Sequence, residues 1–199
     1  MPPLRILGVD PGLNTTGYGV VEVTDRGLKL IEAGVVRGKT RGSLDARLKE
    51  IHAGVADVIA SLQPNIMAVE QLYSHYERPR TAILMGHARG VIILAAAVAN
   101  IPTQSYAATQ VKRMLTGTGR APKSQMQNAI CREFGLLKPP EPPDVADALA
   151  IALCHYYATR AGLETRGIEQ LRPKLKQAKS PASCSQAPLG NTSAEAPLR

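Results

Sequence analysis

The sequence predicts an α/β domain with one five-stranded mixed sheet flanked by helices, and three observations favour this fold class. Three β-branched runs, at residues 4–10, 16–23 and 28–36, are separated by turns containing Gly and Asn, which is typical of an antiparallel meander. A helical period begins near Ser43, after the third run. Helices and strands then alternate along the chain, so the sheet should contain both strand directions.

Each later element has its own pattern. In residues 43–62 apolar side chains recur three and four positions apart, and Ser43 is a candidate N-cap. A Gly-rich loop at residues 116–122 precedes a helix that begins near Lys123. The other predicted elements are a strand at 65–70, a helix over about 79–99, a strand at 102–107, a short helix at 108–115 and a last helix at 142–158.

Composition indicates a globular protein of one domain. The 199 residues are 44% hydrophobic, which suits a full-sized core. No uncharged apolar run reaches the roughly 18 residues of a membrane span, and the first residues lack the basic-then-apolar order of a signal peptide. We therefore expect a cytoplasmic protein that does not enter a membrane.

The cysteines and the carboxyl-terminal region add two expectations. Cys131, Cys154 and Cys184 are far apart and odd in number, which favours reduced thiols over a zinc site or disulfides. Residues 1–160 should form the folded domain. Residues 160–199 hold seven Lys or Arg against three Glu, and the sequence beyond Leu171 has no periodicity. Residues 161–199 are thus expected to be a basic, disordered tail.

Two apolar strands end on a carboxylate. Asp10 ends the first run, and Glu70 ends the strand at residues 65–70. If these strands are neighbours, the two carboxylates meet at one edge of the sheet, where ligands of α/β sheets bind. Like charges repel at that distance unless a cation lies between them. The pattern predicts that Asp10 helps to hold a metal ion.

Asp144 and Asp147 extend this candidate site. They are three residues apart at the start of the last helix, so both project from one face. An alternative is that Asp144 caps the helix and Asp147 is a favourable first-turn charge. Together with Asp10 and Glu70 they favour a hard cation, Mg²⁺ or Mn²⁺, because Cys and His are absent from the set. Such a cluster can hold two ions about 3.5–4 Å apart for phosphoryl chemistry.

A basic stretch indicates a polyanionic partner. Between Arg78 and Arg132 the chain has eight basic residues and no Asp or Glu. The alternative is that these charges serve solubility alone.

Five segments together resemble the RuvC family of bacterial Holliday-junction resolvases, in their expected order and spacing over about residues 4–157. They read "ILGVDPGLNTTGYGVV", "AVEQLY", "ILMGHARGVIILAAA", "VKRMLTGTGRAPKSQMQ" and "DVADALAIALCH". The resemblance implies a ribonuclease H-like fold and a homodimer that uses Mg²⁺ to nick two opposing strands of a four-way DNA junction. It also implies the RuvA–RuvB branch-migration complex as a partner, and roles in recombination and repair.

The resemblance assigns site residues to this sequence. The four catalytic and metal-binding acids are Asp10, Glu70, Asp144 and Asp147. The DNA-binding residues are Lys112 and Lys123 on backbone phosphates, Tyr73 on bases at the junction centre, and Arg80, Arg89 and Arg120 as further contacts.

Three positions depart from the family pattern. Tyr73 replaces the usual Phe, which keeps stacking and adds a hydroxyl, while His87 replaces Gln and Glu77 replaces Asn. These changes bear on sequence preference and loop geometry more than on chemistry. A helix-face histidine without a catalytic role is the favoured interpretation of His87.

The helix around Gly86 and Gly90 is the expected dimer contact. It is apolar over much of its circumference, and its glycines and alanines allow another backbone to approach. Ala88 is placed on the suspected outer face. The alternative is that this helix is buried against its own sheet, and both can hold if opposite faces are used.

Two other function classes remain open from the residues. Actin-like ATPases share the underlying fold and begin with a strand, an Asp and a Gly-rich hairpin, but they need a second domain for which 199 residues leave no room. A non-catalytic DNA-binding module is the second alternative. It does not explain why Asp10 and Glu70 both end apolar strands.

Overall fold

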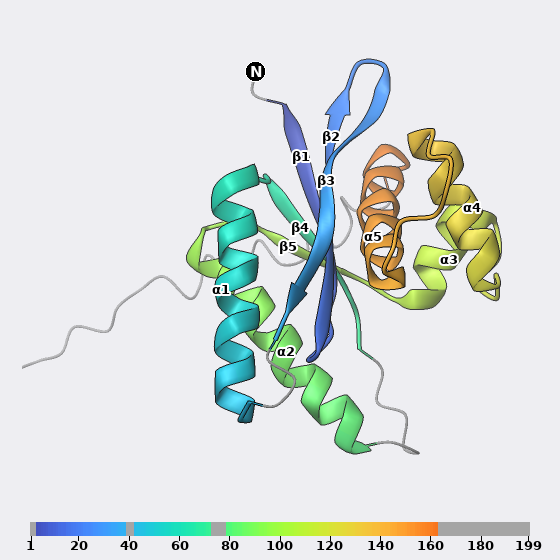
Figure 1. The fold of residues 1–199 in the computed structure, drawn as a ribbon. Coiled ribbons are helices and arrows are strands. Elements are labelled where there is room, and N and C mark those ends of the chain that lie inside the picture. The colour runs from blue at the N-terminus through green and yellow to red at the C-terminus, as the bar shows by residue number, and fades with distance from the viewer. Residues whose placement is uncertain (1–2, 39–41, 73–78, 163–199) are drawn as a thin grey trace, which may run out of the picture. The chain divides into compact units, whose positions relative to one another are not determined.

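The computed structural model describes residues 3–38, 42–72 and 79–162 (Figure 1). These belong to the first of two units, Met1–Leu163, and the second unit, Glu164–Arg199, lies outside the described residues. The predicted disorder of the tail is therefore still a prediction. The free thiols of Cys131 and Cys154 agree with the expected reduced cysteines, and Cys184 is outside the described part.

The predicted mixed sheet is confirmed. Its five strands are β1 (Leu4–Asp10), β2 (Thr15–Thr24), β3 (Gly27–Arg37), β4 (Ile66–Glu70) and β5 (Thr103–Tyr106), in the spatial order β3-β2-β1-β4-β5. The first three form an antiparallel meander, and β4 and β5 add in parallel beside β1. The central position of β1 makes it the neighbour of β4, as the metal-site hypothesis requires.

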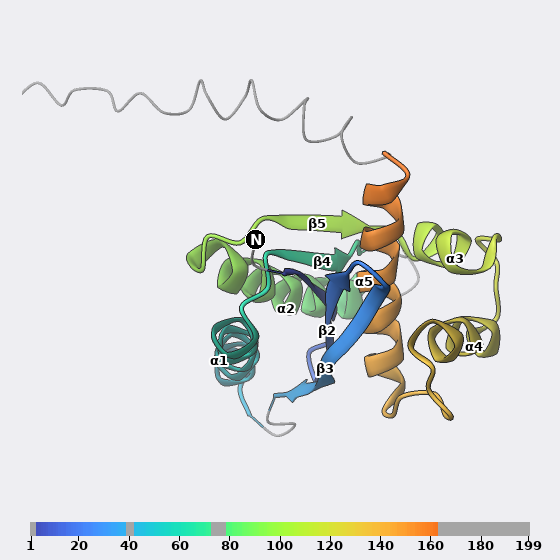
Figure 2. The ribbon, with the colours of Figure 1, turned by 90° about the horizontal axis from the view of Figure 1, so that it is seen from above.

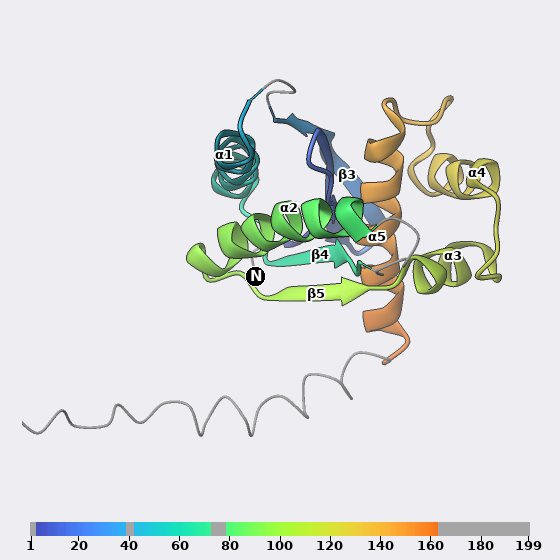
Figure 3. The same ribbon diagram turned by 90° about the horizontal axis from the view of Figure 1, so that it is seen from below.

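Helices cover both faces of this sheet. The helices are α1 (Leu44–Leu62), α2 (Pro79–Val98), α3 (Ala108–Thr116), α4 (Lys123–Phe134) and α5 (Pro143–Arg160). Figures 1 and 2 show α1 and α2 on one face and α5 on the other, with α3 and α4 packed outside α5. Figure 3 shows the same layers from below, with α2 running along the sheet. All bounds lie within about two residues of the predicted ones.

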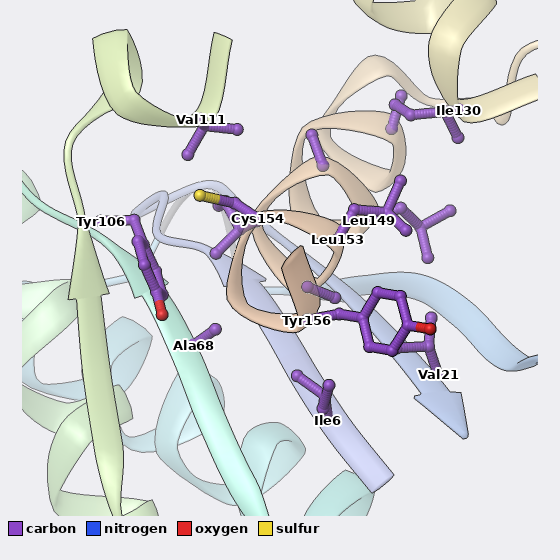
Figure 4. Close-up of a cluster of buried hydrophobic side chains, with 14 of the residues drawn as sticks. Ile6, Val21, Ala68, Tyr106, Val111, Ile130, Leu149, Leu153, Cys154 and Tyr156 are labelled. Atoms are coloured by element: carbon purple, nitrogen blue, oxygen red, sulfur yellow. The ribbon is translucent and has the colours of Figure 1, made fainter. Parts of the chain in front are cut away.

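Strand alternation divides the core into two clusters, one on each face. Ile6 and Ala68 face α5 and pack with Tyr106, Leu149 and other buried side chains (Figure 4). The intervening residues of β1 and β4 face α1 and α2; they are Leu7, Val9, Met67 and Val69. Because side chains alternate, Asp10 and Glu70 belong to the α5 face of their strands.

Three glycines allow α5 to lie directly on the sheet. Gly8 and Gly19 are register partners on β1 and β2, and a Cβ on Gly8 would stand 2.2 Å from the carbonyl oxygen of Ala148. A Cβ on Gly19 would stand 2.5 Å from Leu149, and one on Gly17 would stand 2.1 Å from the carbonyl oxygen of Asp144. Only a hydrogen fits at these positions, so the glycines set how closely α5 approaches.

Helix α2 has one buried and one exposed face, which corrects the placement of Ala88. Ala88 is fully buried and packs with Ile92, Ala95 and Ala96 in the α1–α2 core. The outer face instead carries Ile83, Gly86, His87, Gly90, Leu94 and Val98. The sequence could not separate these faces, because apolar residues surround the whole helix.

By length and composition alone, α2 could also cross a membrane over Arg80–Val98, which is the one such helix found among the described residues. Core helices of soluble proteins pass the same test, and this window contains Arg80 and Arg89. The finding is weak evidence for a membrane span.

Candidate active site

The two strand-end carboxylates stand side by side at the edge of the sheet. Val9 on β1 pairs in register with Val69 on β4, and Asp10 and Glu70 are the next residues of these parallel strands. Both belong to the face covered by α5. Two buried strands can end on charged residues because their carboxyl ends leave the core at the same edge of the sheet.

Asp144 and Asp147 approach these carboxylates from α5. Asp10 pairs with Gly17 on β2, and the backbone of Asp144 lies against Gly17. The N-cap position of α5 is occupied by Pro142, so Asp144 lies inside the first turn. Capping therefore does not account for Asp144, and the glycine contact brings the start of α5 to the end of β1.

The pKa values of the strand-end acids record this crowding. Burial raises the pKa of Asp10, and the negative charges of Glu70, Asp147 and Asp144 raise it too, while Lys123 opposes them; together these effects place the pKa at about 8. Burial also raises the pKa of Glu70, with a contribution from Asp147; a hydrogen bond from Asp10 and the charge of Lys112 act in the opposite direction. The four acids therefore form one electrostatic cluster.

A cleft opens beside the cluster. It has a volume of about 280 Å³ and is lined by Glu70, Asp147, Lys112 and Lys123 together with apolar residues of α3, α4 and α5. Lys123 Nζ lies 3.0 Å from Asp147 Oδ2, and both side chains are partly exposed. The cleft thus joins carboxylates that attract cations to lysines that attract anions.

The donor set fits a hard divalent cation. All four candidate ligands are carboxylates, which Mg²⁺ and Mn²⁺ prefer. A cation among them would relieve the repulsion that raises the pKa of Asp10. Within the described ranges, no three His, Cys, Asp or Glu side chains are already arranged as a metal cluster. The acids share an electrostatic field without forming a closed ligand cage.

The candidate DNA-binding residues are not all in one place. Lys112 and Lys123 line the cleft, Arg120 is exposed in the loop between α3 and α4, and Arg80 is exposed at the start of α2. Arg89 is half-buried, and its Nε donates to the carbonyl oxygen of Glu70 at 2.9 Å. Tyr73 and Glu77 lie outside the described residues.

His87 occupies an exposed position on α2. Its Nδ1 lies 2.8 Å from the carbonyl oxygen of Ile83, one turn earlier in the same helix. This placement agrees with a helix-face histidine.

The glycines that position α5 are not among the site residues that the sequence predicted. Gly17 and Gly19 alternate within a strand pattern, and Gly8 interrupts the first strand. Glycine inside a strand indicates a close backbone approach, so a signal was present. What the pattern could not reveal is which element approaches.

The fold and the carboxylate cluster beside a basic cleft define the class of ribonuclease H-like nucleases. The family model described as "Crossover junction endodeoxyribonuclease RuvC" matches residues 6–155. The chain belongs to this family.

Two relatives and three solved structures illustrate the similarity. A crossover junction endodeoxyribonuclease RuvC of Rhodopirellula baltica is 57% identical over 152 residues, covering 76% of this chain and 85% of the relative. One of Desulforamulus reducens is 45% identical over 150 residues, covering 75% and 91%.

The structure of Thermus thermophilus RuvC is similar with a TM-score of 0.74 and 34% identity, covering 80% of this chain and 97% of that one. A second structure of this RuvC, in complex with a Holliday junction substrate, has the same TM-score and identity and covers 80% and 96%. A yeast mitochondrial Holliday junction resolvase shares the fold, with a TM-score of 0.59 and 12% identity, covering 87% and 86%. These similarities do not favour the actin-like or non-catalytic alternatives.

Proposed function

We propose that this chain is a structure-selective endodeoxyribonuclease that resolves Holliday junctions by nicking two opposing strands, in recombination and DNA repair. The observation that carries the proposal is the convergence of Asp10, Glu70 and the start of α5 beside a cleft with two lysines, in a chain of the RuvC family. The Thermus thermophilus relative, solved with a Holliday junction substrate, supports this choice of DNA.

The acids are proposed to bind metal. Asp10, Glu70, Asp144 and Asp147 would hold two Mg²⁺ ions, or Mn²⁺, which would stabilise phosphate charge and supply an activated water. Asp10 would keep its proton at neutral pH, because its pKa is about 8. Ligation requires the carboxylate form, so binding of the cation should release that proton. Hydrolysis then needs no covalent protein intermediate.

The lysines are proposed to bind the DNA backbone. Lys112 and Lys123 stand on two different helices at the cleft, so a phosphate entering it meets positive charge from both. Lys123 also pairs with Asp147, which keeps its ammonium beside the acids. Phosphate contacts of this kind orient a strand without reading its sequence. Arg80, Arg120 and Tyr73 complete the proposed set.

Assembly and location are part of the proposal. Two nicks related by two-fold symmetry need two sites, which an isologous homodimer supplies. The exposed apolar face of α2, carrying Ile83, Leu94 and Val98, supports this contact. By family resemblance we also propose cooperation with the RuvA–RuvB complex in the cytoplasm.

The test compares a synthetic four-way junction with a linear duplex of matching sequence, each with Mg²⁺, with Mn²⁺ and without metal. We expect paired nicks in the junction only, and only with metal. Asp10→Asn should bind the junction with unchanged affinity and cut below detection. Asn resembles the protonated carboxyl that burial already favours, so this variant should remain folded.

Asp57→Asn is the matched control. Asp57 is exposed on α1, which covers the other face of the sheet, and this variant should cut normally. Undiminished cutting by Asp10→Asn would contradict the proposed chemistry, and equal cutting of both DNAs would contradict the structural selectivity.

A further inference from the structure

Arg89 reaches the end of β4 from α2. Its Nε donates to the carbonyl oxygen of Glu70 at 2.9 Å, and its Nη2 donates to Ser105 Oγ on β5 at 2.6 Å. One half-buried guanidinium therefore joins three elements: α2, β4 and β5. Charge-assisted hydrogen bonds of this length are stronger than neutral ones.

The Glu70 carbonyl has no strand partner on its own side. The N–H of Gln71 donates to the carbonyl oxygen of Tyr106 on β5 at 2.8 Å. In a trans peptide the carbonyl points opposite to the N–H, so the Glu70 oxygen points away from β5, toward β1. The last register pair of β1 with β4 is Val9 with Val69. Arg89 therefore donates to the Glu70 carbonyl the hydrogen bond that a neighbouring strand would otherwise donate.

The Arg89 guanidinium and the Glu70 carboxylate lie on opposite faces of the sheet. Tyr106 faces α5, so its neighbour Ser105 faces α2, and Arg89 meets Ser105 there. The cleft with Lys112 and Lys123 lies on the α5 side, and Arg89 is not among the residues that line it. Arg89 therefore acts on Glu70 through the backbone, at a distance from the cleft in which DNA is proposed to bind.

We propose that Arg89 is a positioning residue: by holding the Glu70 peptide against β5 and α2, it fixes where the Glu70 carboxylate points. The inference rests on the proposed function for its consequence in catalysis. It differs from the phosphate-contact role that the family resemblance suggested for Arg89. An unpartnered carbonyl at this strand end would let the last residue of β4 fray, and Glu70 with it.

Arg89→Gln separates the two roles, because a positioning residue and a phosphate contact change different quantities. We expect cleavage of the junction to fall by about 10–100-fold, the range for residues that orient metal ligands. Junction affinity and its salt dependence should stay as in the parent. Titration with Mn²⁺ in the absence of DNA should show weaker binding by a similar factor.

Hydrogen exchange gives a readout that does not depend on the proposed function. The amide of Gln71, which pairs with Tyr106, should exchange at least about tenfold faster in Arg89→Gln, because the strand end opens more often. Arg26→Gln, in the exposed turn between β2 and β3, is the control and should leave cleavage and exchange unchanged. If the parent does not cut junctions, the proposed function fails while this exchange test still decides the role of Arg89.

Ser105→Ala is the second variant, in case Arg89→Gln does not fold. It removes one of the two contacts and keeps the bond to Glu70, so we expect the same changes at a few-fold size. Weaker junction binding with a smaller salt slope and normal exchange at Gln71 would overturn the proposal and support a phosphate contact. Normal cleavage and exchange in both variants would also overturn it.

Discussion

Burial shifts the pKa values of two side chains on the α5 side of the sheet, Asp10 on β1 and His155 on α5 itself, with opposite outcomes. Asp10 is an acid whose pKa is raised to about 8, first by burial and then by neighbouring carboxylates, and His155 is a base whose pKa burial lowers to about 4. Both are therefore mostly neutral at pH 7 in the absence of a cation. Asp10 stands at the proposed metal site, where binding can restore its charge. His155 stands deep in the core, where its Nδ1 meets the hydroxyl of Tyr106 at 2.8 Å.

The protonation of His155 predicts an acid-sensitive core. In the unfolded chain its pKa is near 6.5 and in the folded protein about 4, so the unfolded state binds more protons between these values. The contribution to stability should be present above pH 6.5 and decline as pH falls toward 4, by at most about 3 kcal/mol. Urea unfolding of the parent and of His155→Gln at several pH values measures the difference.

Comparing the parent with His155→Gln separates the contribution of His155 to the pH dependence of stability from the contributions of the carboxylates, which both proteins share. His155→Gln should be less stable at pH 7 and should lose less stability on acidification. His52→Gln, on α1, is the control and should follow the parent. Parallel curves for the parent and His155→Gln would contradict the assignment.

At the scale of elements, the short helices α3 and α4 build the basic wall of the cleft. Lys112 comes from α3, and Lys123 is the first residue of α4. The loop between them bears Arg120 and ends at Pro122, the residue before α4. Because the two lysines come from two helices, both side chains line the same cleft. On a single helix, two lysines so far apart in sequence would be spread along its length.

This wall predicts a change in the salt dependence of binding. Lys123→Ala should weaken junction binding and lower the slope of log affinity against log salt by roughly one unit, because one phosphate contact is lost. Lys29→Ala is the control. Lys29 is exposed on β3 and pairs with Glu22 at the end of the sheet remote from Asp10. Binding measured from low to moderate salt gives both slopes, and equal slopes for Lys123→Ala and the parent would show that Lys123 is merely solvated.

Elements differ in how far the sequence predicts them. The meander, the helices and the two strands that end on Asp10 and Glu70 follow from local periodicity and from charges that interrupt it. The faces of α2 do not, because Ala88 and Gly90 are equally plausible neighbours for a core or for another chain. Burial of Ala88 depends on the sheet beneath it. The Arg89 contacts likewise depend on where α2 crosses the strand ends.

At the scale of the whole molecule, the two faces of the sheet separate two tasks. The α5 side holds the carboxylates and the cleft, and the α1–α2 side leaves an apolar helix surface uncovered. Leu94 is 52% and Ile83 61% exposed, with Gly86 and Gly90 between them and open space beside each glycine. Such a surface suits close approach by a second copy of the helix.

Leu94→Glu tests this surface, because Leu94 is exposed on it whereas Ala88 is buried. The variant should fold, sediment as a monomer, and lose paired nicking while keeping weak binding of DNA, because a charge would be buried at the contact. Ala60→Glu places the same charge on an exposed position of α1 and should leave the dimer intact. A dimeric, fully active Leu94→Glu would show that another surface pairs the subunits.

The glycines beneath α5 have a consequence for how the chain reaches this structure. A one-residue slip of β2 against β1 turns every side chain of β2 to the other face, so Tyr18 and Val20 would stand where Gly17 and Gly19 now leave room. The backbone of α5 could not then reach the sheet, because a single Cβ there already collides with it. Helix α5 can therefore pack on the sheet only when β1 and β2 are paired in the native register. Because α5 follows β1 and β2 in the chain, its packing selects the strand register in which Asp10 pairs with Gly17 and lies beside the other acids.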